Sequence, residues 1–232
     1  MIKGLYIVLF FAVVLIAESC KNNDEVFPNI PPCAFNVVNA SPDTLNYYLN
    51  GTRQNDNSPL FPASASGYNL INSGSESIQF KKNGGFNVLF SVPLKLTDSL
   101  NYSLFVTGTS ASGSFSTVDI LDTTGINANS YLYYKVRFVN ASPNAGSLDV
   151  YVGDSISFKS KAFKSISGFV LGGANSEQVT IFPAGSTTNP LLDTLITFQA
   201  NNLYTIFSQG QVNGRGSSAF NLGVTLNPFY QQ

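Results

Sequence analysis

The stretch LYYKVRFVNASPNAGSLDVYV, residues 132–152, decides the fold class of this 232-residue chain. Apolar and polar residues alternate over residues 132–138 and again over residues 148–152. A period of two is typical of a half-buried β-strand. The Asn-Ala-Ser-Pro sequence between the two runs ends the first strand, because proline cannot donate to the hydrogen-bonded ladder. The stretch therefore predicts two strands joined by a turn.

The same pattern occurs earlier in the chain. Val38-Asn39-Ala40-Ser41-Pro42 recurs unchanged as residues 139–143, and Ser64-x-Ser66-Gly67-Tyr68 corresponds in register to Ser165-x-Ser167-Gly168-Phe169. This repeat is far longer than the roughly 20 to 50 residues of a solenoid unit. We therefore expect two copies of one domain, each about the size of a small β-sandwich.

Further strands with the same period are predicted at Ser77–Lys81, Ser99–Val106, Val179–Pro183, Leu192–Phe198 and Asn202–Ser208. Asn50-Gly51 and Gly153-Asp154 supply the tight turns that hairpins require. No dozen-residue window after the N-terminal segment shows a helical stripe, so the sequence predicts an all-β protein of two antiparallel sandwiches. The predicted boundaries are a signal peptide at 1–19, a tether at 20–32, a degenerate first repeat at 33–122, a linker at 123–131 and a second repeat at 132–232.

The N-terminal segment predicts export. Lys3 precedes an apolar run from Leu5 to Ala17, which is shorter than the roughly 20 residues that span a bilayer. The approach to Cys20 resembles a bacterial lipobox, although Ala17 stands where leucine is usual and Glu18 is unusual beside the cut. The resemblance implies that Cys20 is acylated and anchors the protein in the outer membrane, on its periplasmic or cell-surface face.

The charged and proline-containing residues 21–32 then form an extended tether. The acidic stretch within residues 21–25 is similar to surface-export signals of some lipoproteins, and the alternative is a solvated linker. With Cys20 acylated, Cys33 has no partner in the chain for a disulfide. We expect Cys33 to be a small apolar residue at the start of a strand, and the alternative is an exposed reactive thiol.

A family resemblance rests on the second copy. The sequence Val-Arg-Phe-Val-Asn-Ala-Ser-Pro at residues 136–143, followed by Leu-Asp-Val-Tyr-Val at 148–152, resembles the V-R-F-x-N-A-S-P signature of a bacterial extracytoplasmic family of unknown function. The likeness covers most of residues 132–210, and the first copy departs from it with Asn36 in place of the arginine. The resemblance implies tandem immunoglobulin-like β-sandwiches in secreted proteins and lipoproteins, and it supplies no catalytic residues.

Composition excludes several classes of activity. The chain has no histidine, two cysteines and a net charge of −1. It therefore cannot build a Ser-His-Asp relay or an ordinary zinc site, and it lacks the basic surface that binds nucleic acid. We predict no cofactor and no metal. Glycan hydrolysis by two carboxylates needs no histidine. Its candidate pairs are Asp119 with Asp122 and Asp149 with Asp154.

Four tyrosines are candidates for ligand contact. Tyr48 and Tyr151 occupy equivalent, outward-facing positions in the two copies, and Tyr131 and Tyr133 lie next to basic residues. Aromatic rings on a sheet can stack on sugar rings. The alternative is cross-strand packing on a solvated sheet.

Five of the nine aspartates are followed by serine or threonine and then an aliphatic residue or threonine. The triplet resembles the O-glycosylation acceptor that some Gram-negative phyla use on exported proteins. The candidate acceptors are Thr44, Ser99, Thr123, Ser155 and Thr194. The alternative is that each Asp-Ser/Thr pair closes a turn before a strand.

These observations predict a non-catalytic, lipid-anchored envelope protein that acts as a binding, adhesion or spacer module. Its expected partners are the membrane, through acylated Cys20, and glycans or other envelope proteins. Two alternatives stay open. One is a glycan hydrolase with a carboxylate pair, and the other is an accessory subunit of a surface glycan-import or fibre complex, in which exposed strand edges pair with a partner.

Overall fold

The computed structural model of the chain describes residues 30–111, 113–122 and 132–227. The described residues from Pro31 onward belong to one compact unit. Apart from one short 3-10 turn, Gly216–Ser218, the regular structure of the described residues consists of β-strands. The predicted all-β sandwich fold is confirmed. Cys20, Thr123 and Tyr131 lie outside the described residues.

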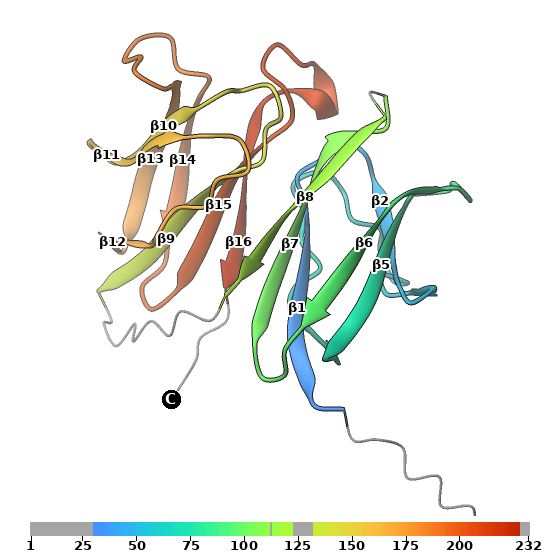
Figure 1. Ribbon diagram of the computed structural model, residues 1–232. Coiled ribbons are helices and arrows are strands. Elements are labelled where there is room, and N and C mark those ends of the chain that lie inside the picture. The colour runs from blue at the N-terminus through green and yellow to red at the C-terminus, as the bar shows by residue number, and fades with distance from the viewer. Residues whose placement is uncertain (1–29, 112, 123–131, 228–232) are drawn as a thin grey trace, which may run out of the picture. The chain divides into compact units, whose positions relative to one another are not determined.

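The first repeat has eight strands in two sheets of four (Figure 1). One sheet has the order β4-β1-β7-β8, and the other has the order β3-β2-β5-β6. The strands are β1 (Pro32–Asn39), β2 (Leu45–Leu49), β3 (Thr52–Arg53), β4 (Asn69–Asn72), β5 (Gly74–Lys82), β6 (Val88–Leu96), β7 (Asn101–Thr109) and β8 (Ser114–Leu121).

The second repeat has the same topology, with sheet orders β12-β9-β15-β16 and β11-β10-β13-β14. Its strands are β9 (Tyr133–Asn140), β10 (Leu148–Val152), β11 (Ser155–Lys161), β12 (Val170–Gly173), β13 (Asn175–Pro183), β14 (Leu192–Phe198), β15 (Leu203–Gln209) and β16 (Asn221–Asn227). The shared topology agrees with the internal duplication in the sequence.

One strand pair in each repeat is parallel. β1 pairs with β7, and β9 pairs with β15, whereas the other pairs between named strands are antiparallel. The strand order also differs from the A-B-E-D and C-F-G sheets of an antibody constant domain. The two-sheet architecture is therefore the predicted one, while the order of strands within it could not be read from period alone.

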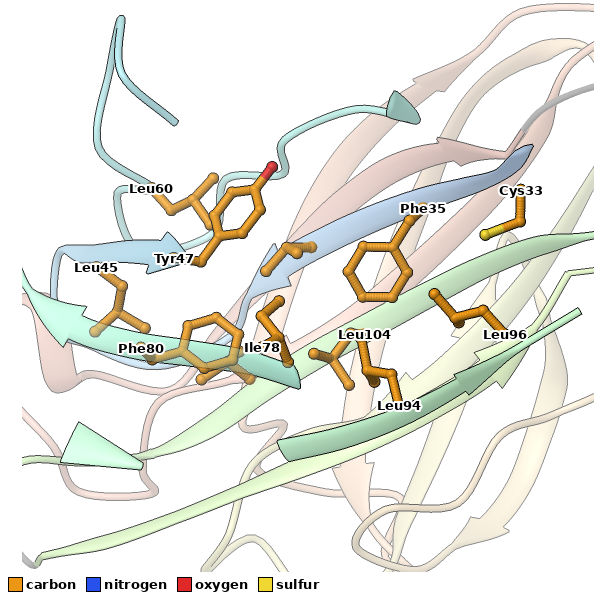
Figure 2. Close-up of a cluster of buried hydrophobic side chains, with 12 residues drawn as sticks. Cys33, Phe35, Leu45, Tyr47, Leu60, Ile78, Phe80, Leu94, Leu96 and Leu104 are labelled. Atoms are coloured by element: carbon orange, nitrogen blue, oxygen red, sulfur yellow. The ribbon is translucent and has the colours of Figure 1, made fainter. Parts of the chain in front are cut away.

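Each repeat encloses its own apolar core between its two sheets. In the first repeat, the core contains Phe35, Leu45, Ile78, Phe80 and Leu104, all buried (Figure 2). In the second repeat, the ring planes of Tyr134 and Phe198 stack with centroids 4.3 Å apart, and Phe138 lies 6.1 Å from Phe158.

The central strands of the sheets that contain the parallel pairs are buried on both faces. β15 is buried along its whole length, and β7 along most of it. The face directed away from each core contributes to a third apolar cluster, which contains residues from both repeats: Val38, Ala40, Phe105, Val118, Ile120, Val139, Ala141 and Phe207. The two repeats therefore share a buried contact.

Candidate functional site

A hollow of about 350 Å³ lies beside β3 in the first repeat. Its wall comes mainly from the connection between β3 and β4, and it carries amide, hydroxyl and aromatic side chains: Tyr47, Gln54, Asn55, Asp56, Asn57, Ser58, Phe61, Ser64, Ser66 and Asn69. This volume falls within the range of small-molecule sites, about 300–1,000 Å³. We treat this hollow as the candidate site and refer to it as the β3 hollow.

The β3 hollow exists because β3 ends after two residues. Asn55 then turns the chain outward and holds it there: its Oδ1 accepts from the Tyr47 backbone N–H at 3.1 Å. Its Nδ2 donates to the carbonyls of Leu45 and Ser58, each at 3.2 Å. The chain returns to the sheet only at Leu60, whose backbone bonds with Leu45 in both directions. Asn55 therefore shapes the wall of the site, since its own polar atoms are already engaged.

Tyr47 forms the floor of the β3 hollow. Its side chain points inward from β2 and is buried beside Leu60, with the hydroxyl directed away from the other apolar side chains (Figure 2). Burial raises the pKa of this phenol above its ordinary value, although a hydrogen bond with Ser66 acts in the opposite direction. Tyr47 therefore stays protonated at neutral pH and offers a hydroxyl as both donor and acceptor.

A second hollow of about 270 Å³ adjoins the first. The two share Tyr47, Gln54 and Asn69, and the second adds the apolar side chains of Leu70 and Ile71. Leu70 is 76% exposed. The two hollows thus share a wall and suit an extended ligand better than a compact one.

The groups available to a ligand are polar and mostly uncharged. Gln54, Asp56, Asn57 and Asn69 are exposed, and Phe61 is 54% exposed at the rim. The Asp56 carboxylate lies 3.7 Å from the Arg53 Nε in an exposed ion pair, so the net charge of this rim is close to zero. Amides, a carboxylate and an aromatic face are the groups that recognise neutral hydroxylated ligands.

The outward-facing tyrosines predicted from sequence lie on separate sheets. Tyr48 is half-exposed on β2, with the Lys81 ammonium 4.5 Å from its ring centre. Tyr151 is half-exposed on β10, packed edge-on against Phe182 at 5.6 Å. Tyr133 begins β9 and is 43% exposed. The contacts of Tyr48 and Tyr151 are those of cross-strand packing, and the two rings form no common platform.

The candidate carboxylate pairs do not converge. Asp122 forms a buried ion pair with Arg137, whereas Asp119 is exposed on the opposite face of the same chain segment. Asp149 accepts from the backbone N–H groups of Ser160 at 2.6 Å and Gly185 at 2.8 Å, and Asp154 lies exposed in a turn. Asp122 and Asp149 are thus engaged in holding the fold.

The Asp-Ser/Thr triplets differ in accessibility. Ser99 and Ser155 are exposed at the starts of β7 and β11, and Thr44 is half-buried before β2. Thr194 lies within β14 opposite the buried Val179. Directly opposed residues share a face of the sheet, so the Thr194 side chain is on the core side. Thr194 is therefore the poorest acceptor of the four described sites.

The Asn-Ala-Ser-Pro sequence is a structural turn in both repeats. Asn39 Nδ2 donates to the carbonyls of Asp43 at 2.7 Å and Leu60 at 2.9 Å. Asn140 Nδ2 likewise donates to the carbonyls of Gly146 and Lys161, each at 2.8 Å. The buried asparagine thus satisfies the backbone where the chain crosses between sheets. The motif therefore stabilises the fold and is not part of the β3 hollow.

Cys33 is buried at the start of β1, where burial raises the pKa of its thiol. This is the apolar role expected from the sequence. Within the described ranges, no three acidic, cysteine or histidine side chains come together as a metal site requires. No helix in the part of the chain that the structure describes is long and apolar enough to cross a membrane.

Comparison with known proteins identifies the second repeat. Residues 134–226 match the family described as "Domain of unknown function (DUF4397)". The second repeat therefore contains a DUF4397 domain, which confirms the expectation of a domain-of-unknown-function family. The match covers less than half of the chain, and no curated protein matches the sequence.

Solved structures of binding modules show a distant likeness. One is a family 26 carbohydrate-binding module from Eubacterium rectale Amy13K in complex with maltoheptaose, 10% identical, with 84% of this chain and 97% of that chain covered and a TM-score of 0.28. Another is a family 41 carbohydrate-binding module from streptococcal virulence factors, 13% identical, with 75% and 92% covered and a TM-score of 0.25. Scores this low carry no argument about function.

Sequence reasoning missed the β3 hollow. The signal was present in the polar run Gln54-Asn55-Asp56-Asn57-Ser58, which stands where the second repeat has the apolar and basic residues of β11. Because a run of amides and an acid in one copy corresponds to a strand in the other, the two copies differ here in backbone structure as well as in side chains.

Proposed function

We propose that the protein is a non-catalytic module that binds a neutral glycan in the β3 hollow. The observation that carries this proposal is the convergence of exposed amide, carboxylate and aromatic side chains around a hollow of small-molecule size. The adjoining hollow, which shares Tyr47, Gln54 and Asn69 with the first, extends the site for a chain ligand. The structural engagement of Asp122 and Asp149 favours binding over hydrolysis.

The ligand contacts follow from the geometry of the wall. Phe61 offers a ring face at the rim, and Asn57 and Asp56 offer hydrogen bonds to hydroxyl groups. Tyr47 offers its hydroxyl from the floor. Gln54 and Asn69, which belong to both hollows, would contact the ligand where it passes from one hollow to the other.

A glycan array probed with the full chain in detergent tests this proposal, followed by calorimetric titration of the best oligosaccharide. We expect Asn57→Ala combined with Phe61→Ala to weaken binding by at least about tenfold, because two ligand contacts are removed. Tyr48→Ala with Tyr151→Ala is the matched control on the outer sheet faces, and it should leave the affinity unchanged. The reverse result would place the ligand on the outer faces, and the absence of any glycan binding would contradict the proposal.

The same samples distinguish binding from hydrolysis. Incubation with the bound oligosaccharide should release no reducing ends. Release that is abolished by an Asp→Asn change would establish the hydrolase alternative. Copurification with specific envelope proteins in the absence of glycan binding would favour the accessory-subunit alternative.

We also propose that the module is lipid-anchored through Cys20 in the outer membrane. The support is the short apolar segment that ends at this cysteine and the polar tether after it. Mass spectrometry of the N-terminal peptide from native membranes should show acyl mass on residue 20. Cys20→Ala should leave an uncleaved precursor, and an unmodified cysteine on a water-soluble native protein would end this part of the proposal.

A further inference from the structure

The buried contact between the repeats brings equivalent residues together. Phe105 of β7 and Phe207 of β15 hold the same place in the two sheets, and their rings meet edge to face with centroids 5.3 Å apart. Both rings belong to the apolar cluster that contains residues of both repeats. A residue contacts its own equivalent only where it lies close to the axis that relates the two repeats.

A second pair of equivalent residues also meets. β8 and β16 pair with their neighbours in the same register, Tyr102 with Leu121 and Tyr204 with Leu226, so Asp122 is equivalent to Asn227. Asn227 Nδ2 donates to Asp122 Oδ1 at 3.3 Å. Two self-equivalent contacts, one apolar and one polar, define one local axis.

The polar residues at this contact between the repeats, which we call the junction, form an ion pair on one side of the axis only. Arg137 forms its buried ion pair with Asp122, and its Nε donates to Thr205 at 2.8 Å. The Phe169 ring lies 4.9 Å from the guanidinium carbon. This side of the junction combines a cation from the second repeat with an anion from the first.

On the other side of the axis, amide side chains replace the charged side chains of the ion pair. The equivalents of Arg137 and Asp122 are Asn36 and Asn227. Asn36 is fully buried, and its Nδ2 has no hydrogen-bond partner within the described residues. Tyr68, the equivalent of Phe169, directs its hydroxyl to Asp122 Oδ2 at 2.7 Å. Asn36 Nδ2, a buried donor without a partner in the described part of the chain, thus lies where a two-fold relation between the repeats would put a second ion pair.

We propose that the β4-β1-β7-β8 face and its equivalent in the second repeat form a self-complementary, two-fold interface whose fitted partner is another copy of the same domain. This chain carries both partners in series. In such an isologous contact each face supplies the same positions, so two Arg-Asp pairs could form, and here one pair has been replaced by two asparagines. Four pairs of equivalent positions carry this polar network, and the apolar cluster also differs between the faces, with Gly223 and Thr225 at the positions of Val118 and Ile120.

An exchange experiment in the full chain tests this symmetry. Ser103, the equivalent of Thr205, donates to Asp122 Oδ2 at 2.7 Å and belongs to the same network. The first half-exchange is Asn36→Arg, Tyr68→Phe, Ser103→Thr and Asp122→Asn, which leaves two guanidinium groups and no carboxylate in the junction. The second half-exchange is Arg137→Asn, Phe169→Tyr, Thr205→Ser and Asn227→Asp, which leaves two carboxylates and no guanidinium. The full exchange makes all eight changes and moves the whole network to the other side of the axis.

Each half-exchange should lower the thermal midpoint by about 10 °C or more, because it leaves buried charges unpaired. The full exchange should unfold above both half-exchanges, since it restores one ion pair and a two-fold interface offers equivalent positions for that pair on the other side of the axis. A half-exchange that fails to fold counts as the lowest midpoint. A full exchange that unfolds no higher than the better half-exchange would overturn the proposal, because the eight changes would then act without symmetry.

Discussion

The two repeats differ most at one sheet edge. In the second repeat the edge strand β11 runs for seven residues and places Phe158 in the core, opposite Val150. In the first repeat β3 runs for two residues. Leu60 and Lys161 are equivalent, since Leu60 pairs with Leu45 and Lys161 pairs with Leu148. Counting back along each chain segment from these two residues makes Asn57 the counterpart of Phe158.

The difference teaches how a hollow can open without loss of the core. Tyr47 of β2, at the position of Val150, supplies from the neighbouring strand the aromatic volume that Phe158 supplies in the second repeat. The edge segment is then free to carry polar residues. The second repeat keeps a closed edge and the family signature, whereas the first repeat has a candidate binding wall in place of the closed edge.

Truncation of Phe158 should have the largest effect. We expect Phe158→Ala to lower the free energy of unfolding by about 3–5 kcal/mol, because a fully buried ring leaves a cavity. Denaturant unfolding measures this. Asn57→Ala at the counterpart position is the control and should change stability by less than about 0.5 kcal/mol, since the side chain is exposed. Equal losses at the two positions would remove the contrast between the edges.

Removal of the Asn55 side chain should have an intermediate effect. Asn55→Ala deletes one acceptor and one donor that hold the wall of the β3 hollow, so we expect a loss of about 1–3 kcal/mol. Glycan binding should weaken in parallel, although Asn55 itself is not expected to touch the ligand. Unchanged stability with lost binding would instead make Asn55 a ligand contact.

A smaller effect is expected at the turn after each Asn-Ala-Ser-Pro sequence. Asp43 accepts from the Ser110 backbone N–H at 2.7 Å, and its counterpart Asn144 accepts from the Val212 N–H at 2.8 Å. Burial alone would raise the pKa of Asp43, but the hydrogen bonds from Ser110 and the Lys82 ammonium 3.2 Å away outweigh it and lower the pKa. The first repeat thus uses an acid where the second uses an amide.

The sign of the pH dependence follows from that lowered pKa. The ionised Asp43 adds stability above its unfolded pKa, and this contribution is lost as the pH falls through the folded value. The free energies of unfolding at pH 7 and at pH 3 should therefore differ less in Asp43→Asn than in the wild type, by about 1 kcal/mol or less. An unchanged difference would show that other carboxylates dominate acid unfolding.

The smallest effect on the fold concerns the candidate glycan acceptors. If the triplets are modified, mass spectrometry of the native protein should find occupancy at Ser99 and Ser155 and little at Thr194, whose side chain lies on the core side of β14. Ser155→Ala should remove the mass at its peptide without changing stability. High occupancy at Thr194 would mean that modification precedes folding.

Local period and repetition made much of the fold predictable. Strong alternation marked β9 and β10, and the strands predicted at 77–81 and 192–198 correspond to β5 and β14. The edge strands β3, β4, β6, β8, β11, β12 and β16 were missed, because they are short or mix small, polar and apolar residues on one or both faces. The parallel pairing of β1 with β7 depends on contacts far apart in the chain, which alternation does not encode.

The candidate site was less predictable than the fold. Tyr48 and Tyr151 attracted attention because aromatic residues at equivalent positions form a visible pattern, and the structure places them in cross-strand packing. The β3 hollow arises from a shortened strand, so its residues carry no repeated pattern. Similarly, Asn36 appeared as a degenerate family position, and only the three-dimensional contact shows that it lies opposite an ion pair across a local axis.

The central position of β1 has a mechanical consequence. β1 is hydrogen-bonded to β4 on one side and to β7 on the other, and it is the first strand of the described residues. A pull on its N-terminal end acts along the strand, so the two ladders are loaded in shear and their hydrogen bonds must fail together. A strand at a sheet edge would instead peel off one bond at a time. A module tethered from this end would therefore resist detachment of its first strand under flow or drag.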